Sequence, residues 1–383
     1  MPIFRYKPPS TRRGVAEAQS AGSAYATTQL QQAVTAIQAD GSKWTFNYDG
    51  YGDLTSVGLP TGGSISYTWT TIGYPNCTGT DRTHVSRAVA SRTLNDNRGQ
   101  VSVWHYAWGN ATATTMTNTV TDPVNNDTVH TFTALDTQSN PTGGCGFYET
   151  RTQIYQGTGN ARQLLKQVDT SYAHAFVSVD DSLTGLNLGN VGASRIQTTL
   201  YPSGKVSLVT REYDAGLGAN APSFGDVTVQ KEYDWGAGVP GPLLRETDTT
   251  YQWQLDSRYL TAHLLDLPAS VIVKDGSGCV VAKTTFGYDE SGYLQTYTGT
   301  LPAGTHGAPP YAVRGNQTSV NRYLWNLASG SCAAVPAQPA VVSHAVWYDT
   351  GELYRQIDPL GHAATHSYDP AYAAPTRRKP ATR

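Results

Sequence analysis

One dipeptide, Tyr-Asp, recurs six times along the 383-residue chain and constrains its fold more than any other feature. The copies are Tyr48-Asp49, Tyr213-Asp214, Tyr233-Asp234, Tyr288-Asp289, Tyr348-Asp349 and Tyr368-Asp369. Twenty residues separate the second copy from the third and the fifth from the sixth, and sixty separate the fourth from the fifth. A fixed period in this range indicates a repeat architecture, in which each unit buries its apolar face by stacking on its neighbours.

The residues around each copy predict a strand, a turn and a returning strand. Apolar side chains alternate before the dipeptide, as at Trp44, Phe46 and Tyr48, which is typical of a strand with one buried face. The aspartate can accept backbone N–H groups in a turn, and a nearby glycine tolerates positive φ. These glycines are Gly52, Gly292 and Gly351, and a leucine that we expect to open the returning strand follows each, at Leu54, Leu294 and Leu353.

The composition agrees with an all-β fold. The chain has 38 glycines and 24 tyrosines, and only 15% of its residues are charged. Aromatic and β-branched residues suit a pleated, half-buried sheet. We therefore predict stacked antiparallel hairpins that form a curled open sheet or a partial β-shell, with tyrosines of neighbouring copies stacked on one face.

The pattern Tyr-Asp-x₂₋₃-Gly-x-Leu, followed in the last full copy by Asp358-Pro359-Leu360-Gly361, resembles the YD repeat of the RHS family. This family includes the Rhs proteins of bacteria and the teneurins of animals. Longer stretches such as KDGSGCVVAKTTFGYDESG are similar as well. The resemblance covers roughly residues 30–369 and is weakest over residues 75–200. It implies a sheet of hairpins that coils into a hollow shell, which in bacterial members encloses a toxic C-terminal domain.

The sequence also departs from that family. The chain is shorter than a shell-forming member, no toxin domain follows the repeats, and Asp358 to Gly361 looks like an ordinary repeat turn rather than the family's self-cleavage motif. We therefore expect a non-enzymatic shell segment that encapsulates or displays a cargo or toxin domain, together with the remaining shell segments. Exposed sheet edges would favour self-association.

The chain divides into three regions by sequence. Residues 1–29 predict a disordered or irregular segment, residues 30–369 the YD-repeat sheet with a divergent part over residues 75–200, and residues 370–383 a Pro/Ala-rich basic tail. No run approaches the ~20 apolar residues of a membrane-spanning helix. The formal net charge of −2 gives no basic field for nucleic acid. We expect the protein to be secreted or at the cell surface, although no signal peptide is visible.

Candidate binding residues are few. Trp104, Trp108, Trp235 and Trp253 could stack against a sugar, which would make the protein a carbohydrate- or protein-binding adhesion module, or they could pack between hairpins.

No catalytic residue, metal site or cofactor is predicted. His362 and His366 lie near Asp358 and Asp369, but we expect His366 to pack on the sheet rather than to act as a ligand or base. The four cysteines form no C-x-x-C pair, which argues against zinc. Cys77 and Cys145 lie in glycine-rich loops and would be either disulfide-bonded in an exported protein or free buried thiols.

Overall fold

The computed structural model describes residues 35–38, 40–74, 84–109, 112, 114–135, 147–178, 186–214, 224–297, 313–323, 340–368 and 375–379. These residues form one sheet of 22 strands with two short α-helices and two 3-10 turns. The prediction of an all-β fold is confirmed. No helix among the described residues is both long and apolar enough to cross a membrane.

The first half of the sheet comprises β1 (Thr35–Ile37), β2 (Lys43–Tyr48), β3 (Leu54–Gly58), β4 (Ser64–Tyr74), β5 (His84–Asn95), β6 (Val101–Gly109), β7 (Thr115–Thr121), β8 (Asp127–Ala134), β9 (Phe147–Gln156), η1 (Gly159–Ala161), β10 (Gln163–Ser178) and β11 (Leu186–Leu200). The second half comprises β12 (Lys205–Tyr213), β13 (Val227–Ala237), β14 (Leu243–Tyr251), α1 (Gln252–Leu255), α2 (Ser257–Thr261), β15 (Pro268–Asp275), β16 (Val280–Tyr288), η2 (Ser291–Tyr293), β17 (Leu294–Gln295), β18 (Gln317–Tyr323), β19 (Val341–Tyr348), β20 (Leu353–Ile357), β21 (Ala363–Tyr368) and β22 (Pro375–Lys379).

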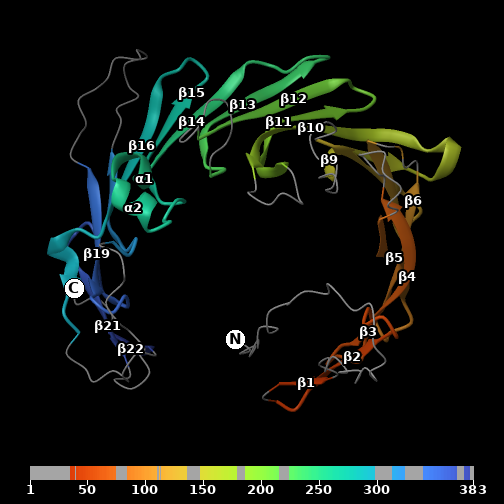
Figure 1. The fold of residues 1–383 in the computed structure, drawn as a ribbon, viewed down its shortest axis with the longest axis horizontal. Helices are drawn as coiled ribbons and strands as arrows, with labels where there is room; N and C mark the ends of the chain where they lie inside the picture. The colour runs from red at the N-terminus through yellow and green to blue at the C-terminus, as the bar shows by residue number, and fades with distance from the viewer. Residues whose placement is uncertain are drawn as a thin grey trace, which may run out of the picture.

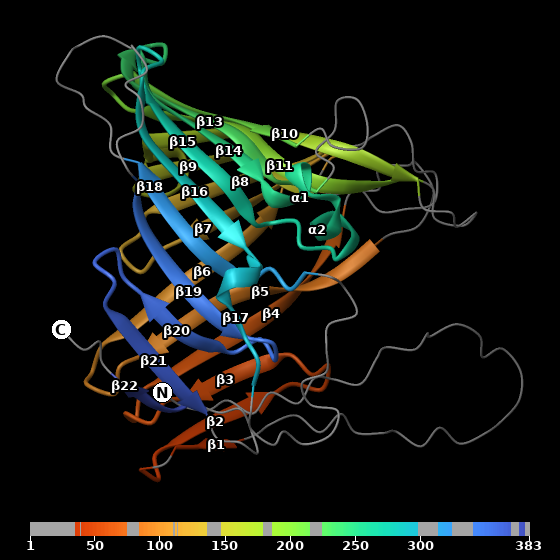
Figure 2. The same cartoon turned by 90° about the vertical axis from the view of Figure 1, so that its left-hand side faces the viewer.

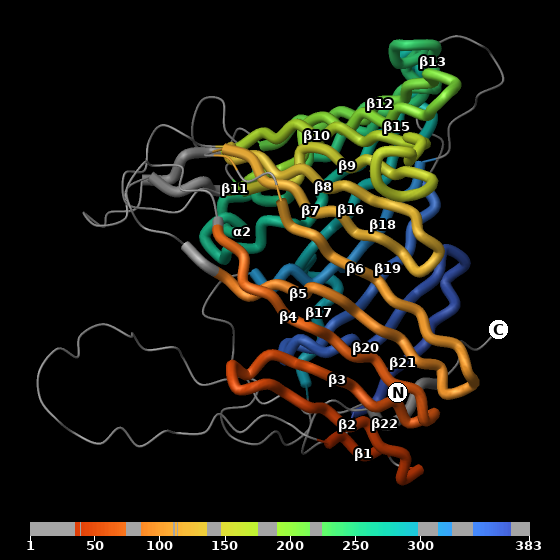
Figure 3. Tube along the Cα trace, turned by 90° about the vertical axis from the view of Figure 1, so that its right-hand side faces the viewer, coloured from red at the N-terminus to blue at the C-terminus, as the bar shows by residue number. Residues whose placement is uncertain are grey.

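Strands pair in the order of the chain, each antiparallel to the next, except that β18 replaces β17 beside β16. The short β17 instead pairs in parallel with the end of β19. The result is a long meander that curls around an open space, with a gap between β1 and β22 (Figure 1). Strands cross the wall obliquely and hairpin turns form its two rims (Figures 2 and 3). β22 falls within residues 370–383, which the sequence predicts to be a tail. It forms a strand because its backbone pairs with the exposed edge of β21.

Ten strands carry an aromatic residue at a β-bulge: nine at alternate positions in the meander, with β6 as the exception, and β13 at Tyr233. At the end of β12, for example, Glu212 pairs with Val229 but Tyr213 pairs with Val227, so the returning strand contains one extra residue. The same shift occurs at Tyr48, Trp69, Phe132, Tyr172, Tyr251, Tyr288, Trp347 and Tyr368. Bulges bend a strand and increase its twist, which helps the sheet to curl.

Seven of these aromatics donate a side-chain hydrogen bond that ties their hairpin to the one before it. The hydroxyl of Tyr213 donates to the backbone carbonyl of Ala193 at 2.9 Å, and Ala193 is the residue that pairs with Tyr172 of the preceding hairpin. We call the set the aromatic ladder. Its other bonds run from Trp69 to Leu54, Tyr172 to Glu149, Tyr251 to Val227, Tyr288 to Pro268, Trp347 to Gln317 and Tyr368 to Leu353.

The two faces of the sheet differ in chemistry. Pairing places Trp108, Asn118, His130, Thr152, Val168 and Thr198 in one row, on the face that carries Phe286 further along. Phe286 packs under the helices, which Figure 1 shows on the inner side of the curve, so this face is concave. The opposite, convex face carries an ion-pair network of Glu212, Lys231, Glu246, Lys274 and Asp248.

The described hydrophobic core is small and lies under α1 and α2. Trp253, Tyr259, Tyr288 and Val313 form its buried centre. The Trp253 ring meets Phe224 edge-on at a centroid distance of 4.9 Å. Elsewhere the wall is a single layer, so its stability depends mainly on contacts between neighbouring hairpins.

A buried acidic group adjoins this core. Asp214 is 1% exposed and accepts the backbone N–H groups of Phe224, Gly225 and Asp226. The Asp226 carboxylate accepts a bond from Trp253 Nε1 at 2.9 Å. Burial, and after it the charges of Asp214 and Asp266, raise the pKa of Asp226 above its usual range, although the Trp253 bond opposes this shift.

We predict that Tyr288→Phe lowers the free energy of unfolding by about 1 kcal/mol, because the carbonyl of Pro268 loses its hydroxyl donor while the ring remains. Urea titration measures the change. Tyr51→Phe is the matched control, since this side chain is 81% exposed, and it should alter stability by less than about 0.5 kcal/mol. Equal effects of the two substitutions would contradict a stabilising ladder.

We predict that the free energy of unfolding of the Asp226→Asn variant increases, relative to that of the wild type, as pH rises. A carboxyl with a raised folded-state pKa contributes stability below its unfolded pKa of about 3.9 and loses it as pH rises through the folded value. Asparagine removes this titration and keeps an oxygen for Trp253. Unfolding at about pH 4 and about pH 7 measures the difference.

Asp256→Asn is the control of opposite sign. The bond from Arg258 lowers the pKa of Asp256, so this carboxylate stabilises the fold above its unfolded pKa and ceases to do so as pH falls through the folded one. The free energy of unfolding of the Asp256→Asn variant should therefore decrease, relative to that of the wild type, as pH rises. A parallel pH trend in both variants would refute the assignment at Asp226.

Candidate functional site

The concave face is the largest candidate site among the described residues. Its side chains include three aromatics in line on β6, namely Trp104, Tyr106 and Trp108, which alternate with outward-facing His105 and Ala107. Residues two apart on a strand are separated by about 6.8 Å. This face therefore presents a row of half-buried rings toward the enclosed space, without a second sheet packed on it in the part that the structure describes.

Trp104 carries a cation on its ring. The guanidinium carbon of Arg92 on β5 lies 4.0 Å from the ring centroid, and Arg92 pairs directly with Trp104 on one side and Tyr67 on the other. Antiparallel partners project to the same face, so the three side chains form one row across β4, β5 and β6. The arrangement suits recognition of a planar or anionic group.

The four predicted stacking tryptophans do not form one site. Trp108 stacks on Phe132 at 6.2 Å, and its ring nitrogen is buried without a hydrogen-bond partner among the described residues. Trp253 belongs to the core, whereas Trp235 lies on β13 and is 41% exposed. Only Trp104 and Trp108 share a strand and a face.

The repeat aspartates close the turns, as their position in the sequence predicts. Asp49 accepts the N–H groups of Tyr51 and Asp53, and Asp289 accepts those of Arg314, Gly315 and Asn316. The predicted positive φ is present at Gly52 (+85°) and Gly351 (+102°). Asp349 accepts the N–H of Tyr297, Asp234 accepts that of Trp235, and Asp369 lies outside the described residues.

The fourth copy differs from the prediction. Asp289 itself has a φ of +50°, whereas Gly292 lies in η2 without a positive φ. Leu294 opens β17, not the returning strand, which is β18. The reason is that the turn at Asp289 is closed by N–H groups from residues about 25 positions later, which leaves residues 291–295 to pack on another strand.

The third copy is out of phase. Tyr233 lies toward the end of β13, the strand that returns from Tyr213, and Asp234 closes a turn at the other rim. Its distance of twenty residues from Tyr213 is therefore the length of half a long hairpin rather than a whole repeat. Where the sequence predicts stacked tyrosines, the rings of Tyr348 and Tyr368 meet edge-on, with centroids 6.3 Å apart.

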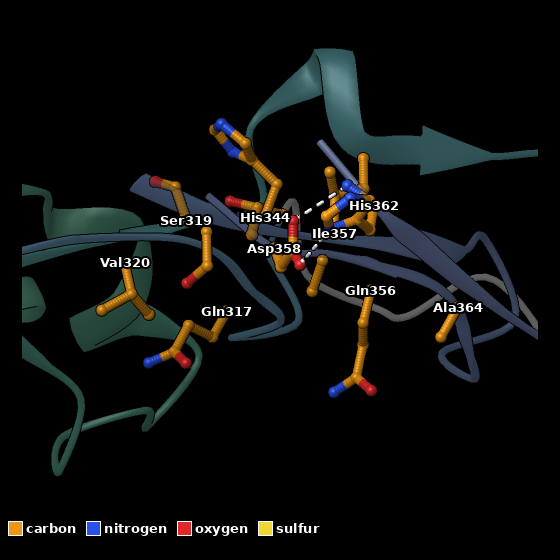
Figure 4. Close-up of a pocket in the computed structure, with 12 residues that line it drawn as sticks. Gln317, Ser319, Val320, His344, Gln356, Ile357, Asp358, His362 and Ala364 are labelled. Carbon is orange, nitrogen blue, oxygen red and sulfur yellow. Dashed lines mark hydrogen bonds and ion pairs between the residues drawn. The ribbon is translucent and has the colours of Figure 1, made fainter. Parts of the chain in front are cut away.

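A cavity of about 380 Å³ lies among β18, β19 and the β20–β21 hairpin (Figure 4). His362 Nδ1 lies 2.8 Å from Asp358 Oδ2, and this bond lowers the pKa of Asp358. The same carboxylate accepts the N–H of Leu360, which assigns Asp358 to its turn. The His344 ring stacks on the ring of Tyr293, with the two centroids 4.4 Å apart. His344 and His362 bond to Tyr293 and Asp358, not to a Ser, Thr or Cys nucleophile, among the described residues.

The remaining chemical predictions concern metals and thiols. His366 lies in β21, and within the described ranges no group of three or more His, Cys, Asp or Glu side chains could hold a metal ion. Cys77 and Cys145 lie outside the described residues. Cys279 is disulfide-bonded, a pairing that the sequence did not single out because no partner is close in the chain.

Sequence reasoning missed Arg92, Tyr67 and most of the aromatic ladder. Trp69, Phe132 and Tyr172 occupy the ladder position without an aspartate after them. All three lie inside their strands rather than at the end, so a search for a strand that ends in an aromatic residue and a turn does not find them. Arg92 gives no local signal, because its neighbours on the face come from other strands.

The chain shows only limited similarity to known proteins. No protein-family model and no curated protein matches the sequence. Among solved structures, a porin-like protein from Bacteroides uniformis ATCC 8492 is 14% identical over 79% of this chain and 91% of that chain, with a TM-score of 0.21. The Tc holotoxin pore of Photorhabdus luminescens is 10% identical over 88% of this chain, with a TM-score of 0.27. TcdB2-TccC3 without its hypervariable C-terminal region is 9% identical over 88% of this chain, with a TM-score of 0.16. The chain spans only 18% and 20% of the length of these two toxin chains.

Proposed function

We propose that the chain is a non-enzymatic segment of a hollow β-sheet shell that wraps a partner polypeptide, such as a cargo or toxin domain. One observation carries the proposal: a single-layer sheet curls around an open space and turns its aromatic face toward that space (Figure 1). A face of this kind gains free energy when another chain covers it, since burial of apolar surface contributes about 25 cal/mol per Å².

The polarity of the wall supports this assignment. The ion-pair network of Glu212, Lys231, Glu246, Lys274 and Asp248 lies on the convex side, where solvent would surround an assembled shell. The repeated turns and the aromatic ladder also agree with the YD-repeat pattern in the sequence. We infer that the sheet is of the RHS kind and that β1 and β22 are edges at which the remaining shell segments, or a second copy, would pair.

A secreted or cell-surface location follows from the same proposal. The disulfide at Cys279 supports it, because structural disulfides persist mainly in oxidising compartments.

A surface-binding module is the second candidate. The row of Trp104, Tyr106 and Trp108 favours it, because exposed ring faces stack against sugars and other apolar planes. Saturable glycan binding that Trp104→Ala abolishes, in a protein purified without any enclosed polypeptide, would select this function.

The shell is tested on the native assembly purified from its source cells. Intact-mass measurement identifies the polypeptide that contains this chain, and digestion with proteinase K follows. We expect a second polypeptide, or a further part of the same one, to resist digestion until the sheet is opened.

The combined variant Tyr213→Phe, Tyr251→Phe and Tyr288→Phe supplies the opening. It removes three ladder bonds of about 1 kcal/mol each, which amounts to about a hundredfold in an opening equilibrium. The protected polypeptide should then be cleaved up to about a hundredfold faster. The shell proposal fails if the native assembly contains no protected polypeptide, or if cleavage is as fast as in the free state.

A further inference from the structure

Arg92 has no carboxylate partner. No ion pair or hydrogen bond from its guanidinium to a described residue is present, although the group is half-buried and lies 4.0 Å from the Trp104 ring. A guanidinium carries five N–H donors, and stacking on a ring leaves its edge available to them. Stacking alone contributes about 0.5–1 kcal/mol at an exposed site.

The carboxylates of the same face are already engaged. Glu149 lies 2.7 Å from His130 Nδ1, and Glu232 accepts bonds from Arg245 and Gln230 at 2.8 Å. Within the described strands of the concave face, these carboxylates therefore leave Arg92 without a partner. The guanidinium is therefore available to an anion from another molecule.

Lys166 on β10 is a second cation of the same kind. It pairs with Ile154 and Leu200 in the row that begins at Tyr106, which places it on the concave face, and no described carboxylate lies within ion-pair distance. Five strand spacings separate β5 from β10, or about 24 Å along the sheet. An extended segment of about eight residues spans that distance.

We propose that Arg92 and Lys166 dock an acidic segment of the enclosed polypeptide, with Glu or Asp carboxylates on the two cations and the intervening residues along the row of Tyr106, Val120, Thr128 and Ile154. This inference rests on the proposed function and adds the chemistry of the partner. Arginine suits the task because it binds a carboxylate through two parallel N–H bonds. The row that leads to Lys166 runs through Tyr106, Val120, Thr128 and Ile154, which carry no charge. Glu149, on the same face, is already paired with His130.

The test uses the full chain and a fluorescein-labelled decaglutamate peptide, with anisotropy as the readout. We expect saturable binding that weakens as salt is added. Arg92→Gln should raise the Kd about tenfold, the equivalent of one charge-assisted hydrogen-bonded contact. Arg92→Lys keeps the charge but loses the paired N–H geometry, so its Kd should lie between the two, and Lys166→Gln should also weaken binding.

Arg195→Gln is the matched control. This arginine is exposed on the convex face beside Gln197, so its removal should leave the Kd unchanged. Far-UV circular dichroism checks that each variant is folded, and Arg92→Lys remains informative if the glutamine variant does not fold.

Two outcomes would overturn the docking site. One is a Kd that is the same for wild type, Arg92→Gln and Arg92→Lys. The other is equal, Arg92-dependent binding of polygalacturonate, which would make the site one for acidic saccharides. The shell is judged separately by protease protection. Protected cargo without Arg92-dependent peptide binding would remove this site alone, and Arg92-dependent peptide binding without protected cargo would support the site and remove the shell.

Discussion

The structure depends on how one hairpin is fastened to the next. A single-layer wall cannot rely on a second layer for its core, and most of its apolar side chains are only half-buried. Strand pairing alone would allow the sheet to twist freely. A bulge in most alternate strands bends the wall, and in most of these strands the aromatic residue at the bulge donates to the backbone of the preceding hairpin, as Tyr213 does to Ala193. Bending and fastening therefore come from the same residue.

Because these bonds join neighbouring hairpins within the sheet, they require no second layer on either face of the wall. The convex face is occupied by its own ion pairs, which satisfy charged groups in contact with solvent. The concave face carries rings and several cations without an ion pair among the described residues, including Arg92 and Lys166. The two sides thus differ in chemistry, and the proposed binding function belongs to the concave one. Among the described residues, the hydrophobic core lies under α1 and α2.

The sequence predicts the fold class, the turn role of Asp49 and the hairpin from Tyr48 to Leu54, because all of these are local. It predicts less where hairpins are long. Tyr233 matches the dipeptide and the spacing but lies on a returning strand, and Phe132 matches neither yet sits at a bulge. The candidate site is harder still, because Arg92 meets Trp104 only through the register of β5 and β6. Pairing between strands is decided by the whole sheet and leaves no mark near either residue.

The way the rim turns are closed has a consequence for how such a protein can change. Asp49 binds N–H groups two and four residues ahead, Asp214 binds groups ten to twelve residues ahead, and Asp289 binds groups 25 to 27 residues ahead. In each of the three turns a single carboxylate binds the N–H groups, and the strand pair that the turn joins has the same register shift. The rim thus tolerates inserted segments of very different lengths at little conformational cost. New loops, and with them new partners, can be acquired there over evolutionary time while the wall stays the same.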